Sequence, residues 1–237
     1  MIPISSDSHI TMPSIAENLE SVRATIAEAA RRAGREPSMV ELIAVSKTHP
    51  PEMIREAMEA GQEAFGENRV QEAMIKIPSL PGILQWHLIG HLQSNKIRKA
   101  LPLFQLIHGV DSVELARDMD RIAGEMGAHP RVLLEVNVSG EASKHGFSPE
   151  SLEKELLALL AMPRLQVEGF MTMAPLAAES ESSRPYFEAL RELRDRMAIK
   201  AGIPLDTLSM GMSGDYRVAV EEGATLVRVG SAIFGNR

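Results

Sequence analysis

The stretch "LIAVSKTHP", residues Leu42 to Pro50, places a lysine directly after a short apolar run and shortly before two prolines. A run that is apolar at consecutive positions is typical of a strand buried on both faces, as in a parallel sheet covered by helices. Lys47 therefore lies at the end of a buried strand. There its amine either reaches water along its alkyl stem or is held in place to react with a ligand.

Short apolar runs of this kind recur along the chain and alternate with helical segments. We expect strands at Leu42–Ser46, Glu63–Gly66, Leu84–Ile89, Leu106–Val110, Val132–Val138, Val167–Thr172, Thr207–Met210 and Leu226–Val229. We expect helices at Pro51–Ala60, Arg69–Ile77, Asn95–Leu101, Val113–Glu125, Pro149–Ala161, Pro185–Ala201 and Gly214–Glu222. Most strands are separated by one helix, which predicts parallel pairing through right-handed crossovers. The length of 237 residues suits an α/β fold of the (β/α)8 TIM-barrel class, which typically takes about 250, and an open doubly wound sheet is the alternative.

An extra helix is expected before the first strand. Ser14 and Glu17 form the S-x-x-E capping-box pattern, and apolar residues then recur at helical spacing until Gly34. The N-terminal segment lacks the basic and apolar regions of a secretion signal, and we expect residues 1–11 to form a flexible tail. No linker or change of composition divides the remainder, which predicts one domain over residues 12–237.

The composition excludes several classes of function. There are no cysteines, so disulfides, thiolate metal sites and cysteine nucleophiles are excluded. The 25 Lys and Arg residues and the 32 Asp and Glu residues give a net charge of −7, and their spread along the chain argues against nucleic-acid binding. No apolar run approaches the roughly 20 residues that span a bilayer. We therefore expect a cytoplasmic protein without a membrane or nucleic-acid partner.

The ends of the last two predicted strands are rich in glycine and serine. In a barrel, the C-terminal strand ends meet at one mouth, and the loops after strands seven and eight often hold a phosphate. "GMSGD" contributes Met212 and Ser213 ahead of a helical stretch, and "VGSAIFG" contributes Gly230 and Ser231. These residues either bind an anion through backbone amides and hydroxyls or only permit tight turns.

Arg228 and Lys47 extend this pattern. A guanidinium inside a barrel needs an acceptor, which is either a carboxylate such as Glu135 or Glu168 or a heteroatom of a ligand. A lysine amine in a partly desolvated pocket can form a Schiff base with an aldehyde. Pyridoxal phosphate (PLP) carries an aldehyde, a phosphate and a ring nitrogen, which match Lys47, the glycine loops and Arg228. A phosphosugar aldolase without a cofactor would need only the first two.

Six motifs, taken in order, resemble those of the pyridoxal phosphate homeostasis protein family. This family includes the bacterial YggS proteins and the eukaryotic proline synthetase co-transcribed homologue. The motifs are "LIAVSKTHP", "FGENRVQE", "WHLIGHLQSNK", "SKHGF", "LSMGMSGD" and "VRVGSAIFG". The resemblance extends over about residues 14 to 235 and is specific because the motifs occur together.

The resemblance implies a single barrel of the alanine-racemase-like type (fold type III) that binds PLP covalently. It implies that Lys47 forms the Schiff base, that Arg228 faces the pyridine nitrogen and that Asn68 of "GEN" lines the pocket near the ring. It also implies that the phosphate is held by Met212, Ser213, Gly230 and Ser231. The family's role is intracellular PLP homeostasis, in which the cofactor is stored or delivered, with apo PLP-dependent enzymes as possible recipients.

The same residues argue against a strong enzymatic activity. A cation opposite the pyridine nitrogen disfavours the pyridinium form and weakens the ring as an electron sink. Racemisation also needs a second acid/base, a tyrosine in alanine racemases, whereas Tyr186 and Tyr216 are both expected on helices. We therefore predict a monomeric cofactor-binding protein with no catalytic residues and no robust turnover. An amino-acid racemase-like enzyme is the alternative.

The sequence does not predict a metal site. His87 and His91 are four positions apart, as zinc ligands on a helix often are, but this stretch is expected to be a strand and a turn. A strand does not bring positions four apart onto one ion. A packed or hydrogen-bonded role inside the barrel is the expectation for His87.

Overall fold

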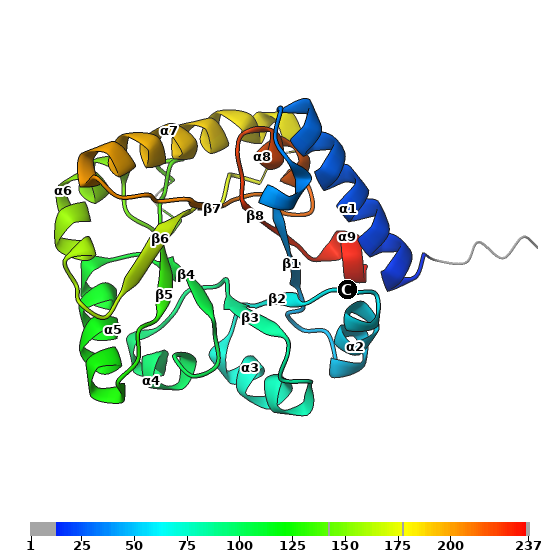
Figure 1. The fold of residues 1–237 in the computed structure, drawn as a ribbon, viewed down its shortest axis with the longest axis horizontal. Helices are drawn as coiled ribbons and strands as arrows, with labels where there is room; N and C mark the ends of the chain where they lie inside the picture. Colours follow the sequence, from blue (N-terminus) through cyan, green and yellow to red (C-terminus); the bar gives the residue numbers. More distant parts are fainter. Residues whose placement is uncertain (1–12, 142, 177, 236–237) are drawn as a thin grey trace, which may run out of the picture.

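The computed structural model describes residues 13–141, 143–176 and 178–235. In these residues, eight parallel strands pair in chain order and close into a barrel (Figure 1). The strands are β1 Glu41–Val45, β2 Ala64–Glu67, β3 Gln85–Leu88, β4 Leu106–Val110, β5 Arg131–Glu135, β6 Gln166–Met171, β7 Thr207–Ser209 and β8 Leu226–Val229. The predicted barrel is confirmed, and the alternative of an open sheet is wrong because β1 pairs with both β2 and β8.

The predicted helices surround the barrel in chain order, and a short helix after the last strand was not predicted. They are α1 Ile15–Arg32, α2 Pro51–Glu59, α3 Val70–Lys76, α4 Ile97–Ala100, α5 Val113–Met126, α6 Pro149–Leu160, α7 Arg184–Ala201, α8 Tyr216–Glu221 and α9 Ser231–Phe234. The predicted tail at residues 1–11 lies outside the described residues, and the single domain proposed for 12–237 is described over the ranges given above. No described helix combines the length and the apolar character needed to cross a membrane.

Many element ends differ from the prediction by one or two residues, and two of the differences have a clear local reason. The fifth strand stops at Glu135 rather than Val138, because the following loop turns back and the amide of Phe147 donates to the carbonyl of Glu135 at 2.8 Å. The last predicted helix begins at Tyr216 rather than Gly214, because the residues before it form a loop. Both deviations occur at the C-terminal ends of strands, where the barrel forms its mouth.

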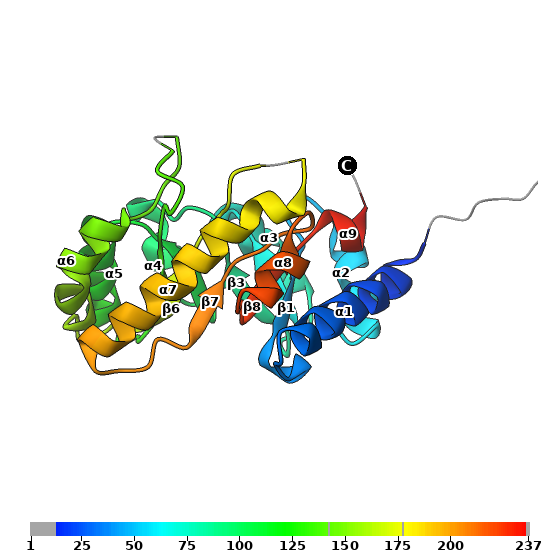
Figure 2. The ribbon, with the colours of Figure 1, turned by 90° about the horizontal axis from the view of Figure 1, so that it is seen from above.

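Helix α1 packs across the outside of the barrel, against α2, α8 and α9 (Figures 1 and 2). The predicted capping box is present: Ser14 N donates to Glu17 Oε2 at 2.8 Å, and Glu17 N donates to Ser14 Oγ at 3.2 Å. Asn18 also donates to the carbonyl of Ile233 at 2.9 Å. This contact ties α1 to α9, which follows the last strand.

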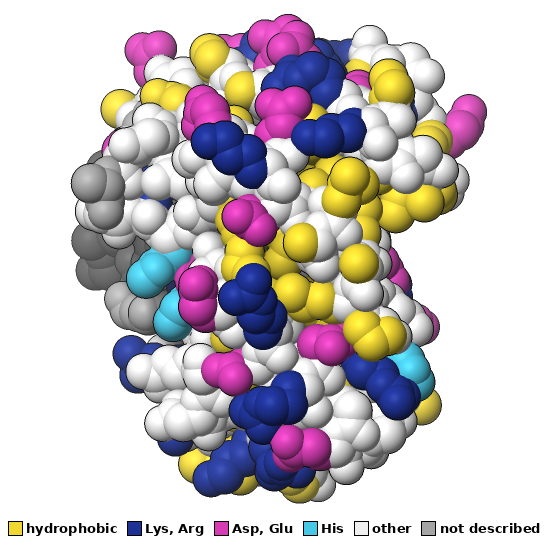
Figure 3. All heavy atoms as spheres, turned by 90° about the vertical axis from the view of Figure 1, so that its left-hand side faces the viewer, with side chains coloured by type: hydrophobic (Ala, Val, Ile, Leu, Met, Phe, Trp, Pro, Cys, Tyr) yellow, Lys and Arg dark blue, Asp and Glu magenta, His cyan; other side chains and the backbone are white. Residues whose placement is uncertain are grey.

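Side-chain alternation sorts the core into two parts. Ile43 and Val45 belong to a small buried cluster that fills the barrel interior, whereas Leu42 and Ala44 belong to the larger cluster between strands and helices. Because successive side chains of a strand point to opposite faces, continuing the alternation past Val45 turns Lys47 inward. Outside the barrel, the face around α5 and α6 carries exposed apolar side chains between charged ones (Figure 3).

The close contact between the backbones of β6 and β7 at Gly169 can be tested by substitution. A Cβ at this position would lie 1.9 Å from the carbonyl oxygen of Thr207, and φ is +158°. We expect Gly169→Ala to lower the free energy of unfolding by about 3 kcal/mol, since backbone has to move to relieve the overlap. Gly124→Ala is the control, because Gly124 lies in α5 with only Arg164 Nε at 3.9 Å from its added Cβ. The control should stabilise the protein by up to about 1 kcal/mol. Urea unfolding measures both, and equal effects would contradict the prediction.

Candidate functional site

The C-terminal strand ends surround a cavity of about 580 Å³. All of the residues predicted to bind a cofactor line it: Lys47, Asn68, Met212, Ser213, Arg228, Gly230 and Ser231. They come from the ends of β1, β2, β7 and β8, which are brought together only by barrel closure. The remaining lining residues include His49, whose ring stacks on Phe234 with 4.9 Å between centroids.

Lys47 is half-buried and follows β1 directly. The next residue, Thr48, has a φ of +65°. A β-branched residue in this left-handed region is a genuine outlier, and such strain costs on the order of 1–3 kcal/mol. The turn is held because Thr48 Oγ1 donates to the carbonyl of Lys47 at 2.6 Å and the amide of Thr48 donates to the carboxylate of Glu72. The strained turn therefore fixes the backbone that carries the amine.

A buried cluster of charges supports this turn from outside the barrel. Lys76 of α3 donates to the carbonyl of Ser46 at 2.9 Å, to Glu67 Oε1 at 2.7 Å and to Glu72 Oε1 at 2.8 Å. Ser46 Oγ also donates to Glu67 Oε1 at 2.7 Å. Glu67 is 0% exposed and Lys76 6%, so both charges are out of water. Burial raises the pKa of Glu67, against the hydrogen bonds from Lys76 and Ser46 that lower it.

The sequence analysis missed this cluster, although the chain contains a signal for it. Glu72 and Lys76 are four positions apart on α3, which is the spacing of an ion pair on one helix face. Glu67 is a carboxylate within the apolar stretch of β2 and needs a partner when buried. What the sequence does not reveal is that α3 packs so that Lys76 reaches both carboxylates.

Asn68 reaches the cavity through a close backbone approach. A Cβ added to Gly90, the residue after Ile89, would lie 2.5 Å from the carbonyl oxygen of Asn68. Glycine in the "IGH" motif thus lets the loops after β2 and β3 touch. Ile89 and Asn68 then line the same side of the cavity.

The two glycine-rich loops are bonded to one another. Ser213 Oγ accepts hydrogen bonds from the amides of Gly230 at 3.1 Å and Ala232 at 3.4 Å. Gly211 has a φ of +91°, and a Cβ there would lie 2.5 Å from Cβ of Ala219, so only glycine fits this turn. Within the described part of the chain, the amides of Ser213 and Gly214 make no hydrogen bond. These amides are donors that an anion in the cavity can use.

Asp215 fixes the first of these loops. Its Oδ1 accepts from the amide of Met212 at 2.7 Å, and its Oδ2 accepts from Ser183 Oγ at 2.9 Å. The carboxylate is therefore bonded to the loop and to the segment before α7. Met212 itself is partly exposed at the cavity rim.

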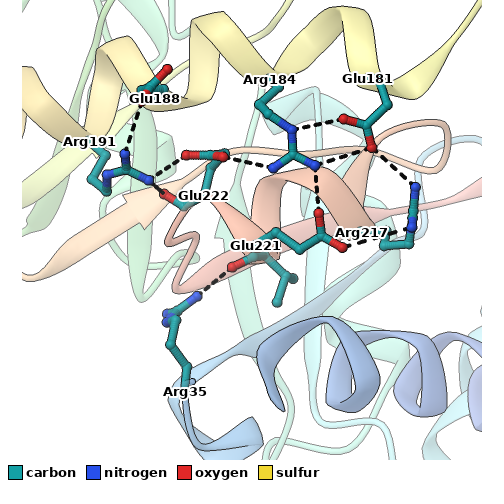
Figure 4. Close-up of polar contacts among 9 residues, drawn as sticks. Arg35, Glu181, Arg184, Glu188, Arg191, Arg217, Glu221 and Glu222 are labelled. Atoms are coloured by element: carbon teal, nitrogen blue, oxygen red, sulfur yellow. Dashed lines mark hydrogen bonds and ion pairs between the residues drawn. The ribbon is translucent and has the colours of Figure 1, made fainter. Parts of the chain in front are cut away.

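A network of ion pairs holds α8, which follows this loop, against α7. It consists of Arg184, Arg191 and Arg217 with Glu181, Glu188, Glu221 and Glu222 (Figure 4). Arg184 lies at the centre, at 2.6 Å from Glu221 and 2.7 Å from Glu222. Arg35, just after α1, donates to the carbonyls of Val220 and Ala224 at 2.8 Å each. Helix α8 is thus held by α7 on one side and by Arg35 on the other. The loop that leads into α8 is held in place with it.

Arg228 lies in the barrel interior at 4% exposure. Its Nη1 donates to Ser209 Oγ at 2.5 Å and its Nη2 to the carbonyl of Thr172 at 2.9 Å. Neither carboxylate considered from the sequence bonds it: Glu168 pairs with Arg131 instead, and no ion pair joins Arg228 to Glu135 among the described residues. Burial lowers the pKa of Arg228 to about 10, which leaves it charged at neutral pH.

A buried chain of polar groups continues from Arg228 across the barrel. His108 Nδ1 lies 2.8 Å from Ser209 Oγ, and His87 Nδ1 lies 3.0 Å from His108 Nε2. Burial lowers the pKa of His87 to about 4 and that of His108 well below its ordinary value, so both rings are neutral near pH 7. The structure thus places His87 in a hydrogen-bonded position inside the barrel. His108 and Ser209 are site residues that the sequence analysis missed.

The family can be determined by comparison with known proteins. The family model described as "Alanine racemase, N-terminal domain" matches residues 18–237. The chain is 44% identical over 222 residues to the pyridoxal phosphate homeostasis protein of Aquifex aeolicus, with 93% of this chain and 97% of the relative covered. It is 46% identical over 228 residues to the protein of that name from Pseudomonas aeruginosa, with 95% and 97% covered. The chain belongs to the pyridoxal phosphate homeostasis protein family.

Solved structures agree with this family. PipY of Synechococcus elongatus is 44% identical, with 94% of this chain and 100% of that chain covered. The TM-score is 0.85 for PipY without PLP and 0.83 for PipY with PLP bound. An alanine racemase of Clostridium difficile matches at 18% identity and a TM-score of 0.74, covering 96% of this chain and 60% of that chain. The last likeness shows the shared barrel fold alone.

The two tyrosines of this family member lie away from the cavity lining. Tyr186 is on α7 and Tyr216 begins α8, as expected, and both pack against the main hydrophobic core. Neither is among the described residues that line the cavity.

The buried ion pair can be tested through stability. We expect Lys76→Met to lower the free energy of unfolding by about 3–5 kcal/mol, because the buried carboxylate of Glu67 loses its counter-charge. Arg32→Ala is the matched control, since Arg32 pairs with Glu28 on the surface at 2.6 Å. An exposed pair of this kind contributes at most about 1 kcal/mol. Urea unfolding measures the free energy of unfolding of both variants. If Lys76→Met lowers it no more than Arg32→Ala does, the cluster is not a structural support.

The buried histidines predict how stability depends on pH. The pKa of His87 is lowered to about 4 in the folded protein. At a pH between this value and the ordinary histidine pKa of about 6.5, the imidazole of residue 87 is therefore protonated in the unfolded chain and neutral in the folded one. The resulting stability is present above about pH 6.5 and is lost as pH falls toward about 4. Between about pH 7 and pH 5, the wild type should lose about 2 kcal/mol more than His87→Gln in urea unfolding. Parallel pH profiles of the two proteins would contradict this.

Proposed function

We propose that this chain binds PLP in the cavity and serves in PLP homeostasis by storing or delivering it. Lys47 would bond the aldehyde carbon as a Schiff base, and the loops containing Met212, Ser213, Gly230 and Ser231 would hold the phosphate. Arg228 would face the pyridine nitrogen, and Asn68 would lie near the ring. The observation that supports this most is that all of these residues line one cavity. PipY, at 44% identity, has been solved with PLP bound.

The residues present fit the chemistry of this cofactor. The half-buried amine of Lys47 suits an aldehyde, and the amides of Ser213 and Gly214 suit a dianionic phosphate. A cavity of about 580 Å³ lies within the range of small-molecule sites. When bound, PLP supplies an electrophilic aldehyde and an aromatic ring that can withdraw electrons. A phosphosugar aldolase would make no use of Arg228.

We further propose that the protein has no robust turnover. Arg228 keeps its charge at neutral pH and disfavours protonation of a ring nitrogen placed before it. Asp215, an acidic group at the cavity, is already bonded to Met212 and Ser183. The relatives are named as homeostasis proteins, which agrees with a role in handling the cofactor. The monomeric state and the cytoplasmic location stay predictions.

A test of the covalent site uses the absorption spectrum. The chain incubated with PLP should show a visible Schiff-base band, and borohydride should fix the cofactor to Lys47, as mass spectrometry of peptides can verify. Lys47→Ala should lose the band. Lys99→Ala, which removes an exposed lysine of α4, should keep it. A band that persists in Lys47→Ala, or label on another lysine, would contradict the assignment.

The role is tested by two assays on the loaded chain. Transfer of PLP to an apo PLP-dependent enzyme, followed as recovered activity of that enzyme, should occur faster than from PLP bound to serum albumin. Incubation with a panel of D- and L-amino acids should give no steady racemisation above that of free PLP. Steady turnover that disappears in Lys47→Ala would favour the racemase-like alternative.

A further inference from the structure

Three side chains that could ligate a metal gather at the barrel mouth, outside the cofactor cavity. They are His91 after β3, Asp111 after β4 and His145 in the loop between β5 and α6, here named the His–Asp–His cluster. None of them is among the residues that line the cavity. Their side chains are 43%, 10% and 61% exposed, respectively, so an ion in solvent can reach them.

The distances within the cluster suit a shared ion. Asp111 Oδ2 lies 2.8 Å from His91 Nδ1 and 3.7 Å from His145 Nδ1. One ligand atom from each residue lies within 4.8 Å of the others. Two donor atoms on one zinc ion, at bonds of about 2 Å, are roughly 3–4 Å apart. Small side-chain rotations are therefore enough to place all three around one centre.

The arrangement of the His91 and His145 imidazole rings also suits a shared ion. The two imidazoles stack with 4.5 Å between centroids and 19° between planes, and both turn Nδ1 toward the same carboxylate oxygen. A divalent cation placed between the rings would bind both of them through nitrogen, while the carboxylate balances part of its charge.

The backbone brings these loops together by glycine contacts. A Cβ at Gly109 would lie 3.0 Å from the carbonyl oxygen of Gly90, so the segments that lead into Asp111 and His91 touch directly. His145 is followed by Gly146, where a Cβ would lie 2.8 Å from the carbonyl oxygen of Glu135. Close-packed backbone therefore lies next to each of the three ligands.

We propose that the His–Asp–His cluster binds one divalent transition-metal ion, of which zinc is the best match to two imidazoles and one carboxylate with water completing the shell. The sequence spacing does not reveal the other ligands of His91, because Asp111 and His145 approach it only in the folded barrel. The ion would also hold the β5–α6 loop at the rim of the cavity. Lys144, next to His145, donates there to the carbonyl of the cavity residue Met173 at 3.1 Å.

The test uses the full chain without an affinity tag, freed of metals with EDTA. Zn²⁺ is titrated by calorimetry, and Co²⁺ by its visible d–d spectrum. We expect one equivalent to bind, and we expect His91→Ala, Asp111→Asn and His145→Ala each to weaken binding at least tenfold. His129→Ala is the matched control, because His129 is an exposed histidine in the loop before β5, at the other end of the barrel.

The outcomes separate the site from its alternatives. Circular dichroism should show that all variants stay folded, and His145→Ala, the most exposed change, is the safest in this respect. Absence of saturable binding would overturn the proposal and leave Asp111 as the hydrogen-bond partner of His91. Binding that is unchanged in the three variants would also overturn it, since the ion would then lie elsewhere. Loss of binding in Lys47→Ala would assign the ion to the cofactor cavity instead.

Discussion

The buried pair of Glu67 and Lys76 is the constraint on which the geometry of the mouth depends. It joins the ends of β1 and β2 to α3, because Lys76 bonds the carbonyl of Ser46 as well as Glu67. Removing two charges from water is costly, and a pair of this kind is weak evidence for stability in itself. Its effect is geometric: it fixes the residue before Lys47, while Glu72 on the same ammonium holds the strained residue after it. The backbone on both sides of Lys47 is thus held by charges that do not line the cavity.

On the opposite side of the cavity from Lys47, the loop before α8 is held by ion pairs that are partly exposed rather than buried. The loop of Met212 to Asp215 before α8 is held by the Asp215 carboxylate and by the ion pairs around Arg184, which are partly exposed to water. Exposed ion pairs contribute about 0–1 kcal/mol each, much less than the about 3–5 kcal/mol lost when a buried pair is broken. The lysine side is therefore fixed rigidly, whereas the loop side relies on several weak contacts that share one helix.

The sequence predicts the local parts of this structure well and the long-range polar contacts poorly. Apolar runs give the strands, and alternation from Ile43 turns Lys47 inward, because both depend on neighbours in the chain. The contact between His108 and Ser209 joins residues 101 positions apart, and it exists only because the barrel closes with one particular register. Asp111 and His91 are 20 positions apart, and Lys76 and Glu67 only nine, but these contacts too depend on how neighbouring elements pack. Residue type shows that such groups need partners, but only the packing of strands and helices decides which ones they obtain.

Arg228 shows how the barrel interior determines the character of the cavity. Its hydrogen bonds go to a hydroxyl and a backbone carbonyl, which are neutral, so they satisfy its donors without cancelling its charge. The charges of Glu135 and Asp215 compensate Arg228 from a distance, and burial together with the charge of Asp111 raises the pKa of Glu135 to about 7. Glu135 is thus only partly ionised at neutral pH, and His87 and His108 are neutral. The barrel therefore presents to the cavity a cation whose charge is only partly compensated. A cation of this kind attracts a ring nitrogen in its basic form and opposes its protonation, so it favours binding of the proposed cofactor over activation of it.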